Sequence, residues 1–221
     1  MKLSVLIPVY NEVSSIATVV ERVAAIPIDT EIILVDDFSA DGSGAVIDAL
    51  PQPNLVVVHH DRNRGKGAAV RTALSQATGD VIVIQDADLE YDPTDLVRLL
   101  EPIEQGRVRV VYGYRNFEGQ RWPLRVGNRF LTAVTNLLFG SDLRDMETCY
   151  KMIDRELTVG LDLTADRFEI EVELTSKLLK SGARIEQLPI SYEPRQGGKK
   201  LVPWIDGPQG LWALIKHRWF V

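Results

Sequence analysis

The first hundred residues alternate between two hydrophobic periodicities, and this alternation limits the possible folds more than any other feature. Short apolar runs rich in valine and isoleucine, typical of buried strands, are each followed by residues with helical spacing. The predicted strands are 3–9, 31–37, 55–59 and 80–85, and the predicted helices begin near residue 13 and cover 40–50, 66–77 and 93–104. Alternating strands and helices imply an α/β fold with a mostly parallel central sheet flanked by helices.

The second half of the chain is less regular. Its pattern predicts strands at 108–113, 149–153 and 184–192 and helices at 124–139 and 168–181. Because no long linker, repeat or low-complexity segment interrupts the 221 residues, we expect a single domain.

The distribution of charge and cysteine narrows the possible partners. A net charge of −6 argues against general binding of nucleic acid. Two late segments are nevertheless basic: residues 107–130 carry six arginines and one acidic residue, and 195–221 carry five Lys or Arg and one Asp. This asymmetry indicates an anionic ligand, although surface charge alone is the alternative for any single arginine. Cys149 is the only cysteine, which excludes an internal disulfide and fits a reducing compartment.

Two carboxylates, Asp86 and Asp88, directly follow the apolar run 81–84. In open α/β sheets, ligands bind at the carboxyl ends of the strands. Hard oxygen ligands at that position suit a divalent cation, and a cation there suits a diphosphate. Capping of the next helix is the alternative interpretation.

Three other motifs follow predicted strands. Pro8-Val9-Tyr10-Asn11-Glu12 offers a flat ring and a carboxylate to a nucleoside, or simply begins a helix. Asp36-Asp37 ends the second strand, where an acid can bind base or ribose. Asn63-Arg64-Gly65-Lys66-Gly67 combines glycines, which allow close approach of a ligand, with a lysine at a helix start. Its spacing is not that of a P-loop, which argues against an ATPase.

The order of these motifs, continued by Asp145-Met146-Glu147-Thr148-Cys149-Tyr150-Lys151, Phe168-Glu169-Ile170-Glu171 and Tyr192-Glu193-Pro194-Arg195, resembles family 2 glycosyltransferases of the GT-A fold. The resemblance spans nearly the whole chain and is closest to the dolichol-phosphate mannose synthase branch, whose enzymes load a sugar onto a polyprenyl phosphate. It implies a nucleotide-sugar and metal half at 1–105, an acceptor half at 106–202 and a C-terminal amphipathic helix at 203–221.

The resemblance also implies roles for individual residues. The nucleoside site would comprise Pro8, Tyr10, Glu12, Asp36 and Asp37, with Lys66 on the nucleotide. Mg²⁺ or Mn²⁺ would be held by Asp86, Asp88 and Glu90, and the lipid phosphate by Arg115, Arg125 and Arg129. Arg195, Lys199 and Lys200 would close over donor or acceptor. If the acceptor is a hydroxyl group, a general base is needed, and Asp145 is the candidate.

The expected reaction is therefore an inverting, metal-dependent transfer of a hexose, mannose or glucose, from GDP- or UDP-sugar to a polyprenyl phosphate. The alternatives are a transferase acting on a sugar hydroxyl, a nucleotidyltransferase and a catalytically silent nucleotide-sugar-binding subunit. No apolar stretch approaches the roughly 20 residues that span a bilayer. We expect a cytoplasmic protein, peripheral on the inner face of the membrane, where the aromatic and basic residues of 204–221 contact lipid or pack on the domain.

Overall fold

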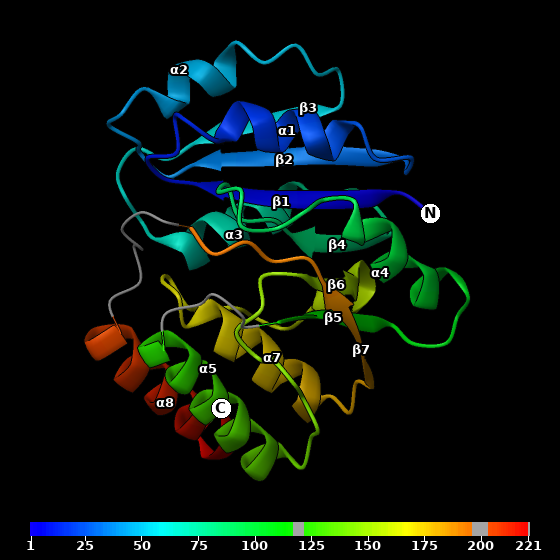
Figure 1. The fold of residues 1–221 in the computed structure, drawn as a ribbon, viewed down its shortest axis with the longest axis vertical. Helices are drawn as coiled ribbons and strands as arrows, with labels where there is room; N and C mark the ends of the chain where they lie inside the picture. Colours follow the sequence, from blue (N-terminus) through cyan, green and yellow to red (C-terminus); the bar gives the residue numbers. More distant parts are fainter. Residues whose placement is uncertain (117–121, 196–202, 221) are drawn as a thin grey trace.

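The central feature of the fold is a seven-stranded sheet in the order β3-β2-β1-β4-β6-β5-β7 (Figure 1). The computed structural model describes residues 1–116, 122–195 and 203–220. The strands are β1 (Leu3–Val9), β2 (Thr30–Asp36), β3 (Leu55–His59), β4 (Val81–Ile84), β5 (Val110–Arg115), β6 (Lys151–Asp154) and β7 (Ile185–Ile190). β6 runs antiparallel to β4 and β5, whereas the other neighbouring strands are parallel. The predicted α/β fold with a mostly parallel sheet is confirmed.

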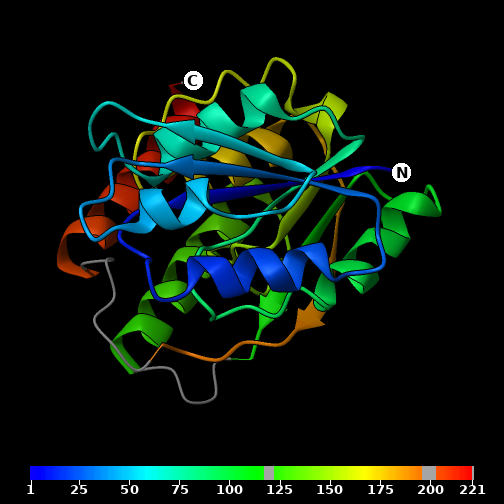
Figure 2. The same cartoon turned by 90° about the horizontal axis from the view of Figure 1, so that it is seen from above.

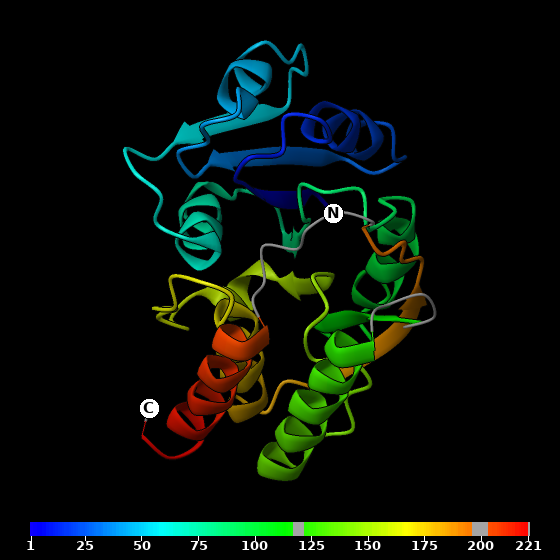
Figure 3. The ribbon, with the colours of Figure 1, turned by 60° about the vertical axis from the view of Figure 1, so that its left-hand side comes forward.

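Helices cover both faces of this sheet. They are α1 (Ile16–Ala24), α2 (Ser43–Asp48), α3 (Lys66–Gln76), α4 (Asp95–Glu104), α5 (Trp122–Phe139), α6 (Arg155–Thr158), α7 (Ile170–Lys180) and α8 (Pro203–Trp219). α1 and α4 lie on one face, and α3 and α7 lie on the other (Figure 2 and Figure 3). Because both faces are covered, the central strands carry apolar residues in succession rather than in alternation, and 32–35 of β2 are fully buried.

The order of the strands creates a crevice at one edge of the sheet. The chain adds β2 and β3 on one side of β1 and β4 on the other, so the connections diverge between β1 and β4. Ligands in open α/β sheets bind at such a switch point, outside the carboxyl ends of the strands. The segments that follow β1 and β4, Tyr10–Glu12 and Asp86–Asp88, therefore meet at the same edge.

The second half differs from the sequence-based prediction in detail. β6 begins only at Lys151, because the backbone N–H of Cys149 is bonded to the Tyr91 hydroxyl instead of to a strand. The short helix α6 was not predicted. Pro93, expected in the first turn of a helix, precedes α4, whose N-cap is Thr94.

The helix α8 packs beside α5 and α7 (Figure 3). On the part of α8 whose side chains the structure describes, residues 207–219, the buried positions are 210, 213, 214 and 217, the spacing of one helical face. Trp212 and Trp219 remain 62% and 61% exposed. Among the described residues, no helix combines the length and the apolar character that a membrane crossing requires.

Candidate active site

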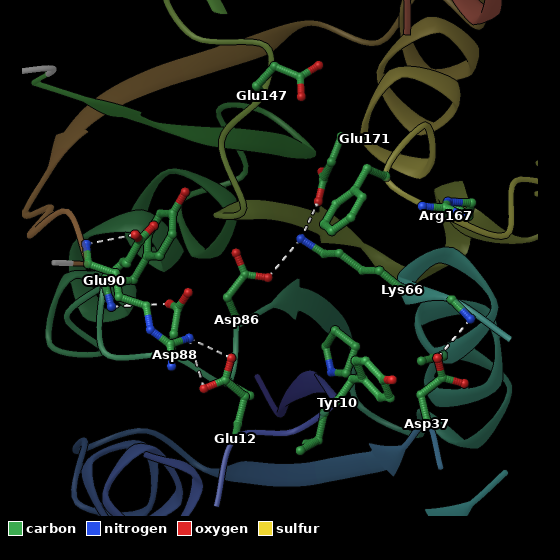
Figure 4. Close-up of a pocket in the computed structure, with 18 of the residues that line it drawn as sticks. Tyr10, Glu12, Asp37, Lys66, Asp86, Asp88, Glu90, Glu147, Arg167 and Glu171 are labelled. Atoms are coloured by element: carbon green, nitrogen blue, oxygen red, sulfur yellow. Dashed lines mark hydrogen bonds and ion pairs between the residues drawn. The ribbon is translucent and has the colours of Figure 1, made fainter. Parts of the chain in front are cut away.

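A cavity of about 610 Å³, here called the pocket, opens at the carboxyl edge of β1 and β4. Residues that are far apart in the sequence come together around it (Figure 4). Ten of the sequence-predicted site residues line it: Pro8, Tyr10, Glu12, Asp37, Lys66, Asp86, Asp88, Glu90, Arg115 and Arg195.

Two predicted residues lie behind the pocket lining. Asp36 is buried, accepts a hydrogen bond from the Ser39 backbone and contacts His59 at 3.2 Å. Asp145 is 1% exposed, and its two oxygens accept hydrogen bonds of 2.7 and 2.9 Å from the Arg115 guanidinium. Asp145 therefore fixes Arg115, which does line the pocket.

The remaining predicted residues lie outside the pocket lining or outside the described residues. Arg125 and Arg129 are exposed on α5, next to Leu124 and Asn128, which do line the pocket. Lys199 and Lys200 belong to 196–202, outside the part of the chain that the structure describes.

At one end of the pocket, Asp37 shapes the turn that leads into α3. Its Oδ1 accepts a hydrogen bond of 2.8 Å from the Arg64 backbone and lies 2.7 Å from Nδ1 of His60. Its Oδ2 accepts a bond of 2.7 Å from the Gly65 backbone. The carboxylate thus holds the glycine-containing turn against the end of β2.

The two glycines of this turn face another part of the protein. A Cβ atom at Gly65 would collide with the carbonyl oxygen of Asp166, and one at Gly67 with that of Ala165. Arg71 of α3 donates hydrogen bonds to the Ala165 carbonyl and, at 2.7 Å, to the Asp166 carboxylate. The glycines therefore let the segment before α7 lie directly on the start of α3.

Lys66 links the strand end to α7. Its Nζ lies 2.7 Å from Asp86 Oδ1 and 3.1 Å from Glu171 Oε1 (Figure 4). Burial disfavours the charged amine. The negative charges of Asp86 and Glu171 have the larger effect, and they raise the pKa of Lys66 well above its usual value. Burial likewise opposes the charge on Asp86. The attraction of Lys66 is stronger than this effect of burial, so the pKa of Asp86 is lowered. The fully buried Lys151 adds a second cation, 2.5 Å from Glu171.

Negative charge is concentrated around Asp88. Burial, followed by repulsion from Asp86 and Glu90, raises the pKa of Asp88 to about 7. Glu90 accepts hydrogen bonds from the Tyr192 hydroxyl and the Arg195 backbone at 3.0 and 2.8 Å. The Arg195 side chain in turn contacts Glu12 at 2.8 Å. The carboxyl groups of Glu12, Asp88 and Glu90 therefore lie together on this side of the pocket, next to Asp86.

This donor set fits a divalent cation. Mg²⁺ is usually bound by one or two carboxylates together with phosphate oxygens of a substrate and water. Asp86 and Asp88 would supply such carboxylates, and a bound cation would oppose the burial and carboxylate repulsion that raise the pKa of Asp88. Within the described residues, no three His, Cys, Asp or Glu side chains are arranged to hold a metal by themselves. The metal role of Glu90 stays a prediction.

Sequence reasoning assigned no role to several residues that line the pocket, namely Glu147, Arg167, Phe168 and Glu171. Glu147, Phe168 and Glu171 lie within the segments on which the resemblance rests, so a signal for them was available. Arg167 lies just before one of these segments, and only the fold brings it to the pocket.

The sheet order and the acidic turn at its switch point, faced by a lysine and an arginine, are the arrangement expected of a GT-A glycosyltransferase. Residues 4–159 match the family model of glycosyl transferase family 2. The chain belongs to this family and is a glycosyltransferase.

Sequence relatives agree with this assignment, and solved structures share the fold. The chain is 30% identical over 208 residues to a polyprenol monophosphomannose synthase of Mycolicibacterium smegmatis, covering 88% of this chain and 78% of the relative. It is 28% identical to an undecaprenyl-phosphate mannosyltransferase of Micrococcus luteus, covering 90% and 86%. The fold is similar to that of glucosyl-3-phosphoglycerate synthase from Mycobacterium tuberculosis, crystallised with Mn²⁺, UDP and phosphoglyceric acid, at a TM-score of 0.81 and 20% identity, covering 100% of this chain and 79% of that one.

Proposed function

We propose that this glycosyltransferase moves a hexose, mannose or glucose, from a GDP- or UDP-sugar to a polyprenyl phosphate, with inversion at the anomeric carbon. The main observation behind the proposal is that two carboxylates and two basic side chains line the same pocket: Asp86, Asp88, Lys66 and Arg115. The names of the two mannosyltransferase relatives support the choice of acceptor.

The nucleoside of the donor would lie at the end of the pocket formed by Pro8, Tyr10 and Asp37. The ring of Tyr10, 38% exposed, offers a surface for the base. Asp37 would act mainly by holding the turn 63–65 in place, and Asp36 by supporting Ser39 and His59 behind it. Arg195, through its contacts with Glu12 and Glu90, would border the donor site on the side of Asp88.

The diphosphate would lie over Asp86, Asp88 and Lys66. A divalent cation, Mg²⁺ or Mn²⁺, held by Asp86 and Asp88 would supply charge neutralisation to the nucleoside diphosphate as it leaves. Lys66 would add a fixed positive charge on the same side, because Asp86 and Glu171 keep its amine charged. Bond cleavage develops positive charge on the sugar ring, which the surrounding carboxylates favour.

Arginines would position the acceptor. A phosphate monoester is already ionised near neutral pH, so it needs orientation rather than deprotonation. Arg115 has a geometry fixed by Asp145, and Arg125 and Arg129 lie four residues apart on the exposed side of α5. Asp145 is poorly suited to be the base that a hydroxyl acceptor requires, since it is buried and both its oxygens bind Arg115. This arrangement favours a phosphate acceptor.

We further propose peripheral contact with a membrane through α5 and α8. Exposed apolar side chains gather on these neighbouring helices: Trp122, Val126, Phe130 and Leu137 on α5, with Trp212, Trp219 and Phe220 on or just after α8. Arg125, Arg129, Lys216 and Arg218 are exposed among them. Aromatic and basic side chains together suit the interface of a bilayer that contains anionic lipids.

A transfer assay tests the reaction. Purified protein with Mn²⁺ or Mg²⁺ and a short polyprenyl phosphate would receive GDP-mannose, UDP-glucose and related donors in turn, followed by mass spectrometry of the lipid phase. A polyprenyl-phosphate hexose, lost on chelation with EDTA and restored by Mn²⁺, is the expected result, and NMR of the product would report the anomeric configuration.

Other outcomes of the same assay separate the alternatives. Release of nucleoside diphosphate without glycolipid would overturn the lipid acceptor and favour a hydroxyl acceptor. Release of pyrophosphate would indicate nucleotidyl transfer. Lack of consumption of every donor, with metal and lipid present, would contradict the proposed function.

A further inference from the structure

Glu147 occupies a junction between two cavities. It lines the pocket and also a smaller cavity of about 70 Å³ between α5, α7 and α8. In Figure 4, Tyr10 and Asp37 lie at one end of the pocket and Glu147 at the other, with Asp86 and Lys66 between them. A donor whose nucleoside lies by Tyr10 and whose diphosphate lies over Asp86 would therefore extend its sugar toward Glu147.

The backbone around Glu147 is held on both sides by buried contacts. Asp145 binds Arg115, and the backbone N–H of Met146 donates to the Thr132 hydroxyl at 3.1 Å. After Glu147, the backbone N–H of Cys149 donates to the Tyr91 hydroxyl at 3.1 Å. A side chain on such a fixed segment can recognise a ligand at low entropic cost.

Glu147 carries a buried oxygen that its described neighbours leave without a hydrogen bond. Its Oε1 is buried, and no hydrogen-bond partner for this atom exists among the described residues. Burial raises the pKa of Glu147 to about 7, with Glu171 and Asp145 adding to the effect and Lys151 and Arg115 opposing it. A buried oxygen without a partner has a free-energy cost that a bound ligand would relieve.

The chemistry of a carboxyl group selects the part of the substrate that it can bind. An ionised carboxylate would repel the phosphate of the acceptor. A sugar hydroxyl, in contrast, can donate to the ionised form of a carboxyl group and accept from the protonated form, so it suits a group that titrates near neutral pH. The transferred hexose carries several such hydroxyl groups.

Resting on the proposed function, we propose that Glu147 is a specificity-determining residue that hydrogen-bonds a hydroxyl group of the transferred hexose. It would act on the sugar and not on the nucleotide, because the nucleoside surface lies at the opposite end of the pocket (Figure 4). The consequence is a donor preference that depends on one hydroxyl position.

Calorimetric titration in Mn²⁺ tests this assignment without requiring turnover. Wild type, Glu147→Ala and Glu147→Gln would be titrated with UDP, UDP-glucose, GDP and GDP-mannose. Glu169→Gln is the matched control, since Glu169 lines only the smaller cavity. We expect Glu147→Ala to reduce affinity for the preferred nucleotide sugar about 10-fold to 100-fold, as for a hydrogen bond to a charged group, with affinity for the nucleoside diphosphate unchanged. Glu147→Gln, which keeps one acceptor oxygen, should restore part of the loss.

Deoxy donors identify the hydroxyl group. Removal of the contacted hydroxyl should weaken binding to wild type and leave binding to Glu147→Ala unchanged. Equal responses of both proteins to every deoxy donor would overturn the inference while leaving the proposed function intact. The inference would also be overturned if Glu147→Ala bound donors normally but lost turnover, because Glu147 would then act as a base. Failure of the wild type to bind any nucleotide sugar would overturn both the inference and the proposed function.

Discussion

At the scale of single residues, the glycines at the start of α3 are required by a neighbouring segment of the protein. The sequence pattern of residues 63–67 was interpreted as a turn that lets a ligand approach the backbone. In the fold, Gly65 and Gly67 instead accommodate the carbonyl groups of Asp166 and Ala165. The glycines therefore affect the pocket indirectly. They allow close packing of the segment that places Arg167 and Phe168 in the pocket lining.

Replacing Gly67 with Ala should destabilise the protein by about 1–3 kcal/mol, because the new methyl group meets a backbone oxygen that cannot rotate away. Gly127→Ala on α5 is the control, since a Cβ there meets open space, and it should stabilise the protein by about 0.5–1 kcal/mol. Urea denaturation of both variants measures the difference. Equal effects of the two substitutions would contradict the packing argument.

Asp88→Asn should remove metal-dependent turnover while the protein stays folded. The substitution keeps the shape of the side chain but removes a charge that a divalent cation needs. Asp92→Asn, on the same loop outside the pocket lining, should leave activity unchanged. Activity at saturating Mn²⁺, compared with the circular dichroism spectrum, distinguishes the outcomes. Full activity of Asp88→Asn would remove this residue from the metal site.

At the scale of elements, Glu31 joins three strands at the edge of the sheet opposite the pocket. Its carboxylate lies on β2, accepts a bond of 2.5 Å from Ser4 of β1 and pairs with Lys2 at 2.6 Å. It also accepts bonds from the backbones of Thr78 and Gly79 just before β4. Burial opposes the charge, but Lys2, Ser4 and Thr78 outweigh it and lower the pKa of Glu31 to about 2.

This network predicts a pH dependence of stability. The folded pKa of Glu31 is lower than its unfolded value, so its contribution is complete above about pH 4.5 and is lost as the pH falls toward 2. A shift of this size corresponds to about 3 kcal/mol. Glu31→Gln should destabilise the protein much more at pH 6 than at pH 3, measured by urea denaturation, and Glu104→Gln on the exposed side of α4 should show no such difference. A pH-independent effect of Glu31→Gln would refute the network.

The first-half strands were predictable because burial on both faces requires an uninterrupted apolar run, as in β2 and β4. The start of β6 was not predictable, because it depends on the hydrogen bond that the Cys149 backbone donates to Tyr91, about sixty positions away in sequence. In the candidate site, too, some features follow from local sequence and others from the tertiary fold. Motifs after the strands identified Asp37 and Asp86, whereas the pairing of Asp145 with Arg115 depends on the tertiary fold.

At the scale of the whole molecule, α8 has two faces with different environments. Leu214 and Ala213 are buried against the domain, whereas Trp212 and Trp219 are exposed. Deleting the helix would therefore expose core surface as well as remove the aromatic residues. Point substitutions separate the two effects.

Trp212→Ser combined with Trp219→Ser should weaken binding to vesicles that contain anionic lipid, and the protein should remain folded. Each tryptophan at a bilayer interface contributes apolar contact that serine cannot replace. Val159→Ser, which removes another exposed apolar side chain away from α5 and α8, is the control. Co-sedimentation with vesicles measures the effect, and equal binding of all three proteins would exclude a membrane role for these tryptophans.

The ion pair between Glu12 and Arg195 joins positions 183 residues apart. During synthesis on the ribosome, β1 to β4 can assemble once residues 1–84 have emerged, but this side of the pocket cannot close until residue 195 has been made. Contacts of such long sequence separation form late, because ordering the intervening chain is entropically costly. A nascent chain that holds only these strands would therefore have an unfinished pocket, and closure of the pocket would report completed folding of the domain.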